Sequence, residues 1–346
     1  MFALPTPTAR RTSSSRSCGR SAAKWAAITG YETSALALHD VSTAEAVIAS
    51  RDSARARAIL GQLGVRPRRL RVVGSRRNVH WVVQTTSERV VLRRYAIDRS
   101  WDDVAWELGL LERLHDRGWP VAPALTPPFQ ERDGIWCLFP FLLGRPRSPR
   151  TISNLRVEQR ERGRLLARLH EDLADLADLG QRPGWLPAHE GLWVRAGRRD
   201  PADLLSEFER AHGEPGRVLR VYAERASERL EALLPFAPRP IVIHGDFAPW
   251  NLRYGGGVLT GILDFDSSHL DLRVADFALA WRGRHQDVIS GYEQEAPLEP
   301  VERELVGPVY WAWVVASAVG GLDAGNVTPE GVAWAVEHLL RTDLLQ

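Results

Sequence analysis

The sequence predicts an α+β protein of two lobes, with a small N-terminal lobe built on an antiparallel sheet and a larger, mostly helical C-terminal lobe. Short strand-like segments separated by glycine-containing turns are concentrated between residues 70 and 142. Segments with the apolar spacing of helices dominate from residue 156 onward. Strands grouped before helices favour an α+β arrangement. The length of 346 residues is enough for two or three packed units.

We expect three parts along the chain: a basic extension over residues 1–40, a first lobe over 41–143 and a second lobe over 144–346. The extension is rich in Arg, Ser, Thr and Ala and shows no sustained periodicity, which predicts disorder. It lacks the apolar core of a secretory signal, whereas an organellar transit peptide or a nucleic-acid-binding arm stays open. A dispensable extension is the favoured interpretation.

Charge and composition exclude several function classes. Residues 1–77 hold 14 basic against 4 acidic residues, whereas residues 78–346 hold 31 against 39. The acidic balance of the second stretch fits a cationic small molecule better than nucleic acid. Two cysteines argue against a disulfide framework and for a reducing, cytoplasmic location. No apolar run reaches the roughly 18 residues that span a membrane.

The first lobe is expected to begin with a helix. Ser42 and Glu45 have the spacing of a capping box, and residues 44–63 follow as a helix that lies against the lobe. Residues 70–95 have the pattern of three strands, with Gly74 and Ser75 in the first turn. In the third strand, alternation puts Val91 and Arg93 on one face.

A helix is predicted over residues 101–117. Its apolar stripe is Trp101, Val104, Ala105, Leu108, Leu111 and Leu114. Glu107 borders this stripe. Residues 134–144 then have the pattern of a buried strand that continues into a connector.

The C-terminal part is predicted to be mainly helical. Helical spacing or composition favours helices over 156–179, 203–234, 270–283, 302–318 and 329–342. His170 is interpreted as a structural histidine of the first of these. The same helix carries an acidic face, interpreted as solvated surface or as a rim for an amine-bearing substrate: Glu171, Asp172, Asp175 and Asp178.

The most informative stretch is residues 241–266. Residues 241–243 form a short apolar strand that runs into a polar loop ending at Asn251. A hairpin with a Gly255–Gly257 turn then delivers Asp264 beside Asn251, with Asp246 one loop away. Carboxylate and amide oxygens suit Mg²⁺, which leaves Asp246 to accept a hydroxyl proton. An Asp, an Asn five residues later and a downstream Asp is the order used in phosphoryl transfer.

This stretch resembles a known family. The residues His244-Gly-Asp-Phe-Ala-Pro-Trp-Asn251, Leu263-Asp-Phe265 and Val274-Ala-Asp-Phe-Ala278 are similar to the motifs of the aminoglycoside phosphotransferase family. That family belongs to a protein-kinase-like superfamily with homoserine and choline kinases. The resemblance runs from about Val72 to near the C-terminus, and it implies a protein-kinase-like fold with nucleotide bound by the N-terminal lobe.

The resemblance also implies roles for single residues. Asp246 is the catalytic base, Asn251 and Asp264 hold the metal, and Asp276 braces the catalytic loop. Gly74 and Ser75 cover the phosphates of ATP, and Val91 lies under the adenine. The connector, estimated as Phe139, Pro140, Phe141 and Leu142, is the hinge that binds adenine through its backbone.

Arg93 departs from the kinase pattern, which has Lys at the phosphates. Arginine can still pair with phosphate and carboxylate, but its planar fork is larger. The resemblance implies that Glu107 pairs with Arg93, with Glu112 as the rival. The departure bears on nucleotide affinity and geometry more than on the chemistry.

We therefore predict an ATP- and Mg²⁺-dependent kinase that phosphorylates a hydroxyl of a small molecule, such as an aminoglycoside or another amine-bearing acceptor. Alternatives are a homoserine- or choline-type metabolite kinase and a nucleotide-binding pseudokinase, for which Arg93 is the only support. Four tryptophans of the second lobe are either core or a cation–π pocket for the acceptor: Trp250, Trp281, Trp311 and Trp313.

Other nucleotide or metal chemistries fit less well. Neither a P-loop motif nor a G-x-G-x-x-G dinucleotide fingerprint is present. A metallohydrolase would use as ligands His244, Asp246, Asp264, Asp266 and His269. That alternative leaves the pattern of Asn251, Arg93 and Glu107 without an explanation.

Overall fold

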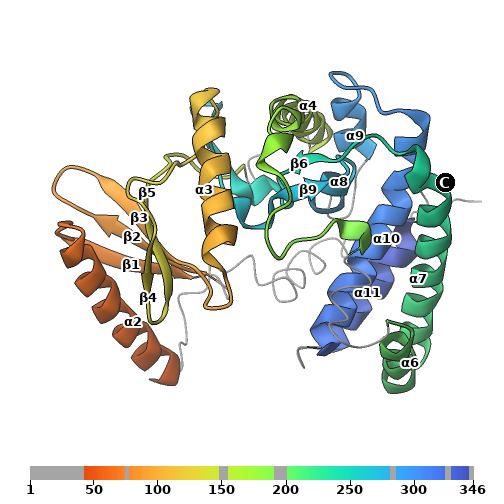
Figure 1. The fold of residues 1–346 in the computed structure, drawn as a ribbon, viewed down its shortest axis with the longest axis horizontal. Coiled ribbons are helices and arrows are strands. Elements are labelled where there is room, and N and C mark those ends of the chain that lie inside the picture. Colours follow the sequence, from red (N-terminus) through yellow and green to blue (C-terminus); the bar gives the residue numbers. More distant parts are fainter. Residues whose placement is uncertain are drawn as a thin grey trace, which may run out of the picture.

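A computed structural model describes residues 43–74, 78–147, 155–190, 201–280, 286–323 and 329–342. The predicted α+β fold with two lobes is confirmed. A five-stranded antiparallel sheet with one helix on its outer face lies at one end of the molecule, and a helical body lies at the other (Figure 1). The predicted extension over residues 1–40, and Ser42 of the expected capping box, lie outside the described residues.

The sheet has the strand order β1-β2-β3-β5-β4. Its strands are β1 (Arg69–Gly74), β2 (Val79–Gln84), β3 (Arg89–Arg94), β4 (Phe129–Glu131) and β5 (Gly134–Pro140). The helix α2 (Thr43–Gln62) packs its Ile59 and Leu60 against the outer face of the sheet. There Trp81 and Trp136 stack with ring centroids 5.2 Å apart. Because strand residues alternate between faces, Arg93 points to the opposite, inner face.

On the inner side lies α3 (Trp101–Asp116). Ser100 caps its N-terminus, because its side chain accepts a hydrogen bond from the Asp103 N–H. The predicted stripe is only partly right. Trp101 is 45 % exposed and Ala105 is exposed, whereas Asp103 and Glu107 are buried. The helix is rotated relative to the apolar prediction because these two acids meet buried arginines, as described below.

The connector between the two parts is tied to a hairpin of the C-terminal part. The N–H of Arg145 donates to the Tyr254 carbonyl over 3.0 Å, and the N–H of Tyr254 donates back over 2.9 Å. The Thr260 hydroxyl donates to the Leu143 carbonyl over 2.6 Å. The segment after β5 is therefore anchored to the hairpin that delivers Asn251 and Asp264.

The C-terminal part is mostly helical. Its helices are α4 (Leu155–Ala174), α6 (Pro201–His212), α7 (Glu214–Leu233), α8 (Ala275–Ala280), α9 (Gln286–Tyr292), α10 (Pro300–Asp323) and α11 (Pro329–Thr342), with short 3₁₀ turns η2 (Ala177–Leu179), η3 (Leu234–Phe236), η4 (Pro249–Asn251) and η5 (Phe265–Ser267). Its strands form two pairs: β6 (Ile241–Ile243) with β9 (His269–Asp271), and β7 (Leu252–Gly255) with β8 (Val258–Ile262).

Three helix predictions are wrong in detail. The helix expected over 156–179 ends at Ala174, and residues 177–179 form the separate turn η2. The helix expected over 203–234 is two helices, because Gly213 adopts φ +60° between α6 and α7. The helix expected over 270–283 begins only at Ala275, because residues 269–271 pair with β6 as a strand. That pairing puts the segment after Asp264 beside the strand that leads into His244.

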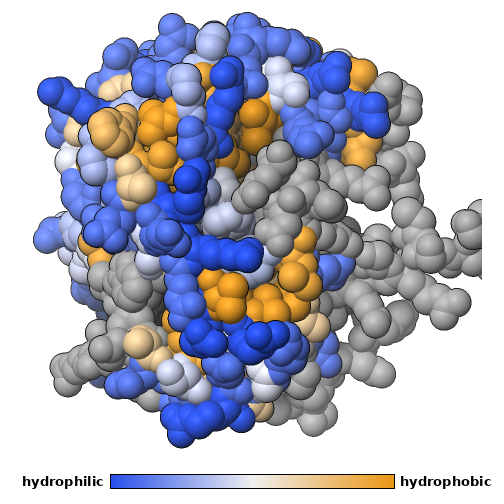
Figure 2. All heavy atoms as spheres, turned by 90° about the vertical axis from the view of Figure 1, so that its right-hand side faces the viewer, coloured by the Kyte–Doolittle hydropathy of each residue, from blue (hydrophilic) through white to orange (hydrophobic). Residues whose placement is uncertain are grey.

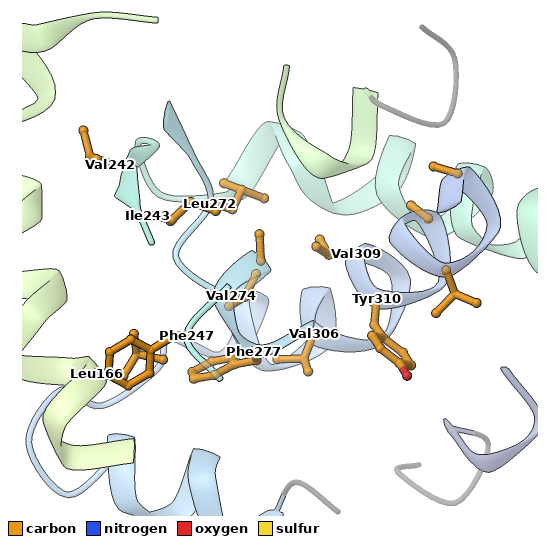
Figure 3. Close-up of a cluster of buried hydrophobic side chains, with 14 of the residues drawn as sticks. Leu166, Val242, Ile243, Phe247, Leu272, Val274, Phe277, Val306, Val309 and Tyr310 are labelled. Atoms are coloured by element: carbon orange, nitrogen blue, oxygen red, sulfur yellow. The ribbon is translucent and has the colours of Figure 1, made fainter. Parts of the chain in front are cut away.

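A buried apolar core packs against β6 and the loop that follows it. Figure 3 shows Val242 and Ile243 of β6 with Phe277 of α8, Val309 of α10 and Phe247 of the loop after β6. Phe247 is fully buried, so it anchors the loop next to Asp246. On the face shown in Figure 2, hydrophilic side chains separate the exposed hydrophobic areas, as on an ordinary solvated helical surface. No helix in the described ranges is long and apolar enough to cross a membrane.

Candidate active site

The second residue of the loop after β6 is Gly245, which no other residue type can replace without strain. Gly245 adopts φ +78°. A Cβ atom built there would lie 2.1 Å from the Ser267 carbonyl oxygen, far inside van der Waals contact. The loop that carries Asp246 therefore lies directly against the turn that follows Asp264.

Asp276 holds this loop from below. Its Oδ2 accepts the His244 N–H over 2.8 Å, and its Oδ1 accepts the Gly245 N–H over 2.7 Å. His170 Nε2 adds a third contact, 2.9 Å from Oδ2. Burial opposes the charge on Asp276, but the hydrogen bond and charge of His170 more than offset it, and the pKa of Asp276 is lowered. Asp276 is thus in place to brace the loop, and His170 sits in a structural position.

His244 joins the two loops. Its Nδ1 accepts the N–H of Asp246 over 3.1 Å, and its Nε2 donates to the Leu263 carbonyl over 3.1 Å. Burial lowers the pKa of His244 to about 4, although the nearby Asp276 charge acts in the opposite direction. The imidazole is therefore neutral near pH 7, with one nitrogen accepting and the other donating.

The three oxygen-bearing side chains singled out in the sequence do meet. The Asn251 amide nitrogen donates to Asp246 twice, to the carbonyl over 2.8 Å and to Oδ2 over 3.1 Å. The backbone of Leu263 bonds to the Asn251 carbonyl over 2.9 Å, which places Asp264 next to that pair. These bonds use the Asn251 side-chain nitrogen and not its oxygen, and an amide oxygen is a group that can bind a cation.

Asp264 is held in an unusual conformation. Its φ of +66° makes it the only described residue other than glycine with positive φ. Burial, followed by the charge of Asp246, raises the pKa of Asp264 to about 7. Two carboxylates that repel each other in a partly buried site, beside an amide oxygen, fit a divalent cation, which favours their charged forms.

Arg93 and Glu107 form an ion pair. Arg93 Nη1 lies 2.6 Å from Glu107 Oε1, so Glu107 and not Glu112 is the partner. Arg93 Nη2 binds a second acid, Asp266, over 2.8 Å. The guanidinium also lies over the Tyr95 ring, 4.1 Å from its centroid, and its Nε has no hydrogen-bond partner in the described structure.

These contacts belong to a closed ring of six buried charged side chains. Arg182 bonds to Glu107 over 2.9 Å and to Asp103 over 2.5 Å. Arg99 bonds to Asp103 and to Asp266, each over 2.7 Å. Three cations thus alternate with three anions in the order Arg93, Glu107, Arg182, Asp103, Arg99 and Asp266, and each side chain in this charged ring is at most 13 % exposed. Burial alone would raise the pKa of Asp266, but Arg93 and Arg99 lower it to about 2.

The residues expected around the nucleotide base lie together. Val91 pairs with Phe139 across β3 and β5, and Val90 pairs with Pro140. Phe141 follows with its ring 4.3 Å below the Arg89 guanidinium. Gly74 ends β1, and Ser75 lies outside the described residues. The roles assigned to these residues stay predictions.

Two alternative interpretations do not fit the geometry. The proposed metallohydrolase ligands point elsewhere: both His244 nitrogens are used inside the loop, and Asp266 belongs to the charged ring. Among the described residues no group of three or more His, Cys, Asp or Glu side chains could hold a metal. The acidic face predicted on the helix over 156–179 is not a free rim either, because Arg117 pairs with Asp172 in α4 and with Asp175 just after it. Arg113 likewise pairs with Asp178.

The tryptophans that were predicted to be either core or an acceptor pocket can be placed only in part. Trp311 is 5 % exposed in the apolar core, with the Tyr222 ring against it at 5.5 Å. Trp313 is partly buried between Tyr310 and Trp334. Trp281 lies outside the described residues. Core packing is therefore the observed role of Trp311.

The fold and site together define a protein-kinase-like phosphotransferase. A family profile described as "Phosphotransferase enzyme family" matches residues 69–305. The chain therefore belongs to this family, as the motifs predicted, and it is a small-molecule kinase by class.

Named relatives support the assignment. The chain is 30 % identical to a homoserine kinase of Xanthobacter autotrophicus over 65 % of its own length and 71 % of the relative. It is 26 % identical to a homoserine kinase of Phenylobacterium zucineum, over 73 % and 79 %. Among solved structures, the GDP and kanamycin complex of APH(2")-IIia is 15 % identical with a TM-score of 0.63, covering 84 % of this chain and 98 % of that one. This likeness establishes the shared fold.

Sequence reasoning missed most of the charged ring. Arg99, Asp103 and Arg182 received no role, and Asp266 was considered only as a hydrolase ligand. The one available signal was Asp266 itself, a second acid two residues after Asp264. Arg182 stands in a loop without periodicity, so nothing in its local sequence marks it as buried.

Proposed function

We propose that this protein transfers the γ-phosphoryl group of ATP to a hydroxyl group of a small, amine-bearing alcohol, with Mg²⁺ as cofactor. The convergence of Asp246, Asn251 and Asp264 at one point carries the proposal. The nucleotide complexes of related folds support it, since an APH(4)-Ia structure holds ADP and hygromycin B. A cytoplasmic location, suggested by the two cysteines, stays part of the proposal.

Asp246 acts as the base in this mechanism. Asp246 is 4 % exposed, and the Asn251 amide aligns its side chain by bonding to Oδ2. The other carboxylate oxygen can then face the acceptor hydroxyl. It orients that hydroxyl and accepts its proton as the hydroxyl oxygen bonds to the γ-phosphorus and the bond from that phosphorus to the bridging oxygen breaks, which releases ADP. Most of the rate then comes from positioning and electrostatics, because the bond changes occur on the substrates.

Asn251 and Asp264 would hold Mg²⁺ through their side-chain oxygens. The ion, when bound, neutralises charge on the transferred phosphoryl group. Its binding requires the charged form of Asp264, whose pKa is raised to about 7 without a counter-ion. Arg93, kept in place by Glu107 and Asp266, supplies a fixed positive charge for the phosphates.

For the acceptor we favour a short amino alcohol of the homoserine type. The long matches to curated relatives are homoserine kinases, and an aminopropanol kinase shares the fold with a TM-score of 0.60 at 17 % identity. An aminoglycoside is the second candidate, supported by 39 % identity over 59 residues to an aminoglycoside 3'-phosphotransferase of Escherichia coli, 17 % of this chain and 22 % of that protein. The acidic balance of residues 78–346 suits both amines.

The test is a coupled ADP-release assay with ATP or GTP and a panel of homoserine, aminopropanol, choline and aminoglycosides. Asp246→Asn should lower turnover by roughly 10²–10⁴-fold, because proton acceptance is lost, while nucleotide affinity changes little. Asp178→Asn, at an exposed ion pair between α3 and η2, is the control and should keep full turnover. Near-normal turnover by Asp246→Asn would refute the base assignment. Nucleotide binding without turnover of any acceptor would favour the pseudokinase alternative.

A further inference from the structure

Arg182 makes more polar contacts than the mechanism above uses. It follows η2 in the chain, its side chain is fully buried, and all three of its nitrogens have partners. Nε and Nη2 bind Asp103 and Glu107 of α3 over 2.5 and 2.9 Å. Nη1 points the other way and donates to three carbonyl oxygens, those of Phe265, Asp266 and Ser268, over 3.1, 3.1 and 2.9 Å.

The two sets of partners belong to two elements, α3 and the turn after Asp264. Arg99 also joins them, through Asp103 and through the Asp266 side chain and carbonyl, the latter over 3.2 Å. Arg182 adds the carbonyls of Phe265 and Ser268. Asp103 and Glu107 lie on the helix that holds Arg93, and the three carbonyls form the turn that follows Asp264. Arg182 is 75 to 86 residues away from all of them in the sequence. A planar guanidinium suits this double task, because its donors diverge in one rigid plane.

The turn after Asp264 needs stabilising contacts of this kind. Asp264 has a left-handed backbone, which an L-residue adopts only when the surrounding structure enforces it. The Phe265 carbonyl, one of the Arg182 acceptors, belongs to the very next residue. Releasing that carbonyl frees Asp264 to relax toward an ordinary conformation, which would turn its carboxylate away from Asn251.

We propose that Arg182 is a positioning residue for the metal site, which holds Asp264 in its ligating conformation by clamping the Phe265–Ser268 turn to α3. This inference rests on the proposed function, since it concerns the Mg²⁺ site of the same kinase. Arg182 is fully buried behind α3 and the turn, so it acts through these elements. Its loss therefore acts on the coupling between Mg²⁺ and nucleotide rather than on nucleotide contacts themselves.

The experiment measures that coupling in the full chain. AMP-PNP is titrated calorimetrically with Mg²⁺ and with EDTA, and the ratio of the two Kd values is the coupling factor. Arg182→Met is compared with Arg162→Met, which removes another buried arginine, paired with Glu158 inside α4 and away from the turn. Circular dichroism at the temperature of the titrations confirms that each variant is folded.

We expect both variants to unfold at lower temperature, but only Arg182→Met to lose about tenfold or more of the coupling factor. A wild-type coupling factor in folded Arg182→Met would overturn the inference and leave Arg182 a structural residue. A wild-type chain with no coupling between Mg²⁺ and AMP-PNP would instead refute the proposed function, so the two failures are distinct.

Arg182→Lys covers the case in which the methionine variant does not fold. Lysine retains the charge balance of the ring, but a single ammonium group cannot reach two carboxylates and three carbonyls at once. We expect an intermediate, roughly threefold loss of the coupling factor, with the affinity for AMP-PNP in EDTA unchanged. Unchanged coupling in this variant would also contradict the positioning role.

Discussion

Two loops meet at the site, and they are held in opposite ways. The loop with Asp246 is held by one anion, Asp276, which accepts two backbone N–H groups from about 30 residues upstream. The turn after Asp264 is held mainly by a cation, Arg182, which donates to three backbone carbonyls that lie more than 80 residues downstream of it, while Arg99 shares the Asp266 carbonyl over 3.2 Å. An anion satisfies donors in one loop, and a cation satisfies acceptors in the other.

The difference teaches how each loop can fail. Asp276 is balanced by a hydrogen bond from His170, so its support is compact and close to the motif. Arg182 is balanced by two acids of α3, so its support extends through the whole charged ring into the N-terminal lobe. We expect damage at Asp276 to act locally on catalysis, and damage in the ring to spread to nucleotide and metal binding.

The largest effect is expected from Asp276→Ala. The substitution leaves two buried N–H groups and His170 without their acceptor, and it should cost about 3–5 kcal/mol of unfolding free energy in urea titrations. Asp271→Ala is the matched control, because Asp271 is equally buried and accepts the N–H groups of Ala188 and Leu272. Both should be destabilised, but only Asp276→Ala should lose turnover where it is folded. Equal turnover in the two variants would show that the loop needs no brace.

A smaller effect is expected where the two loops touch. Gly245→Ala forces a Cβ against the Ser267 carbonyl and strains a positive φ, at a cost of about 2 kcal/mol. Gly256→Ala carries a similar strain at φ +57°, but its Cβ would have no atom within 4 Å. Its loss of stability therefore measures the cost of the backbone strain alone. The excess loss of stability in Gly245→Ala, with a fall in kcat, measures the contact between the loops. Equal losses would mean that the loops can separate freely.

The smallest effect is expected from a substitution in the charged ring, at Arg93. Arg93→Lys restores the usual kinase residue, yet an ammonium cannot bind Glu107 and Asp266 together as the guanidinium does. We expect nucleotide affinity to fall by roughly tenfold, about 1.4 kcal/mol. Arg94→Lys, on the opposite face of β3 and 3.3 Å from Asp133, should leave affinity unchanged. The reverse ranking, measured by calorimetric titration, would show that Arg94 is the phosphate-facing residue.

The catalytic segment could be predicted because its geometry is local. Strand, loop, hairpin and glycine turn lie within 26 residues, so spacing alone brings Asn251 and Asp264 close together. The pairing of Arg93 with Glu107 followed from the resemblance and is present in the structure. The helix over 270–283 was misplaced because residues 269–271 pair with a strand 28 residues upstream, and no local pattern reports such a partner.

The sequence by itself determined the family, the order of sheet and helices, and the identity of the residues at the centre of the site. Those features depend on apolar period, turn chemistry and a contiguous motif. Only the tertiary structure decided which of 45 basic and 43 acidic side chains are buried and paired. The reason is physical: Arg, Asp and Glu are usually exposed, so a charged residue acquires its role from the distant partners that folding brings to it.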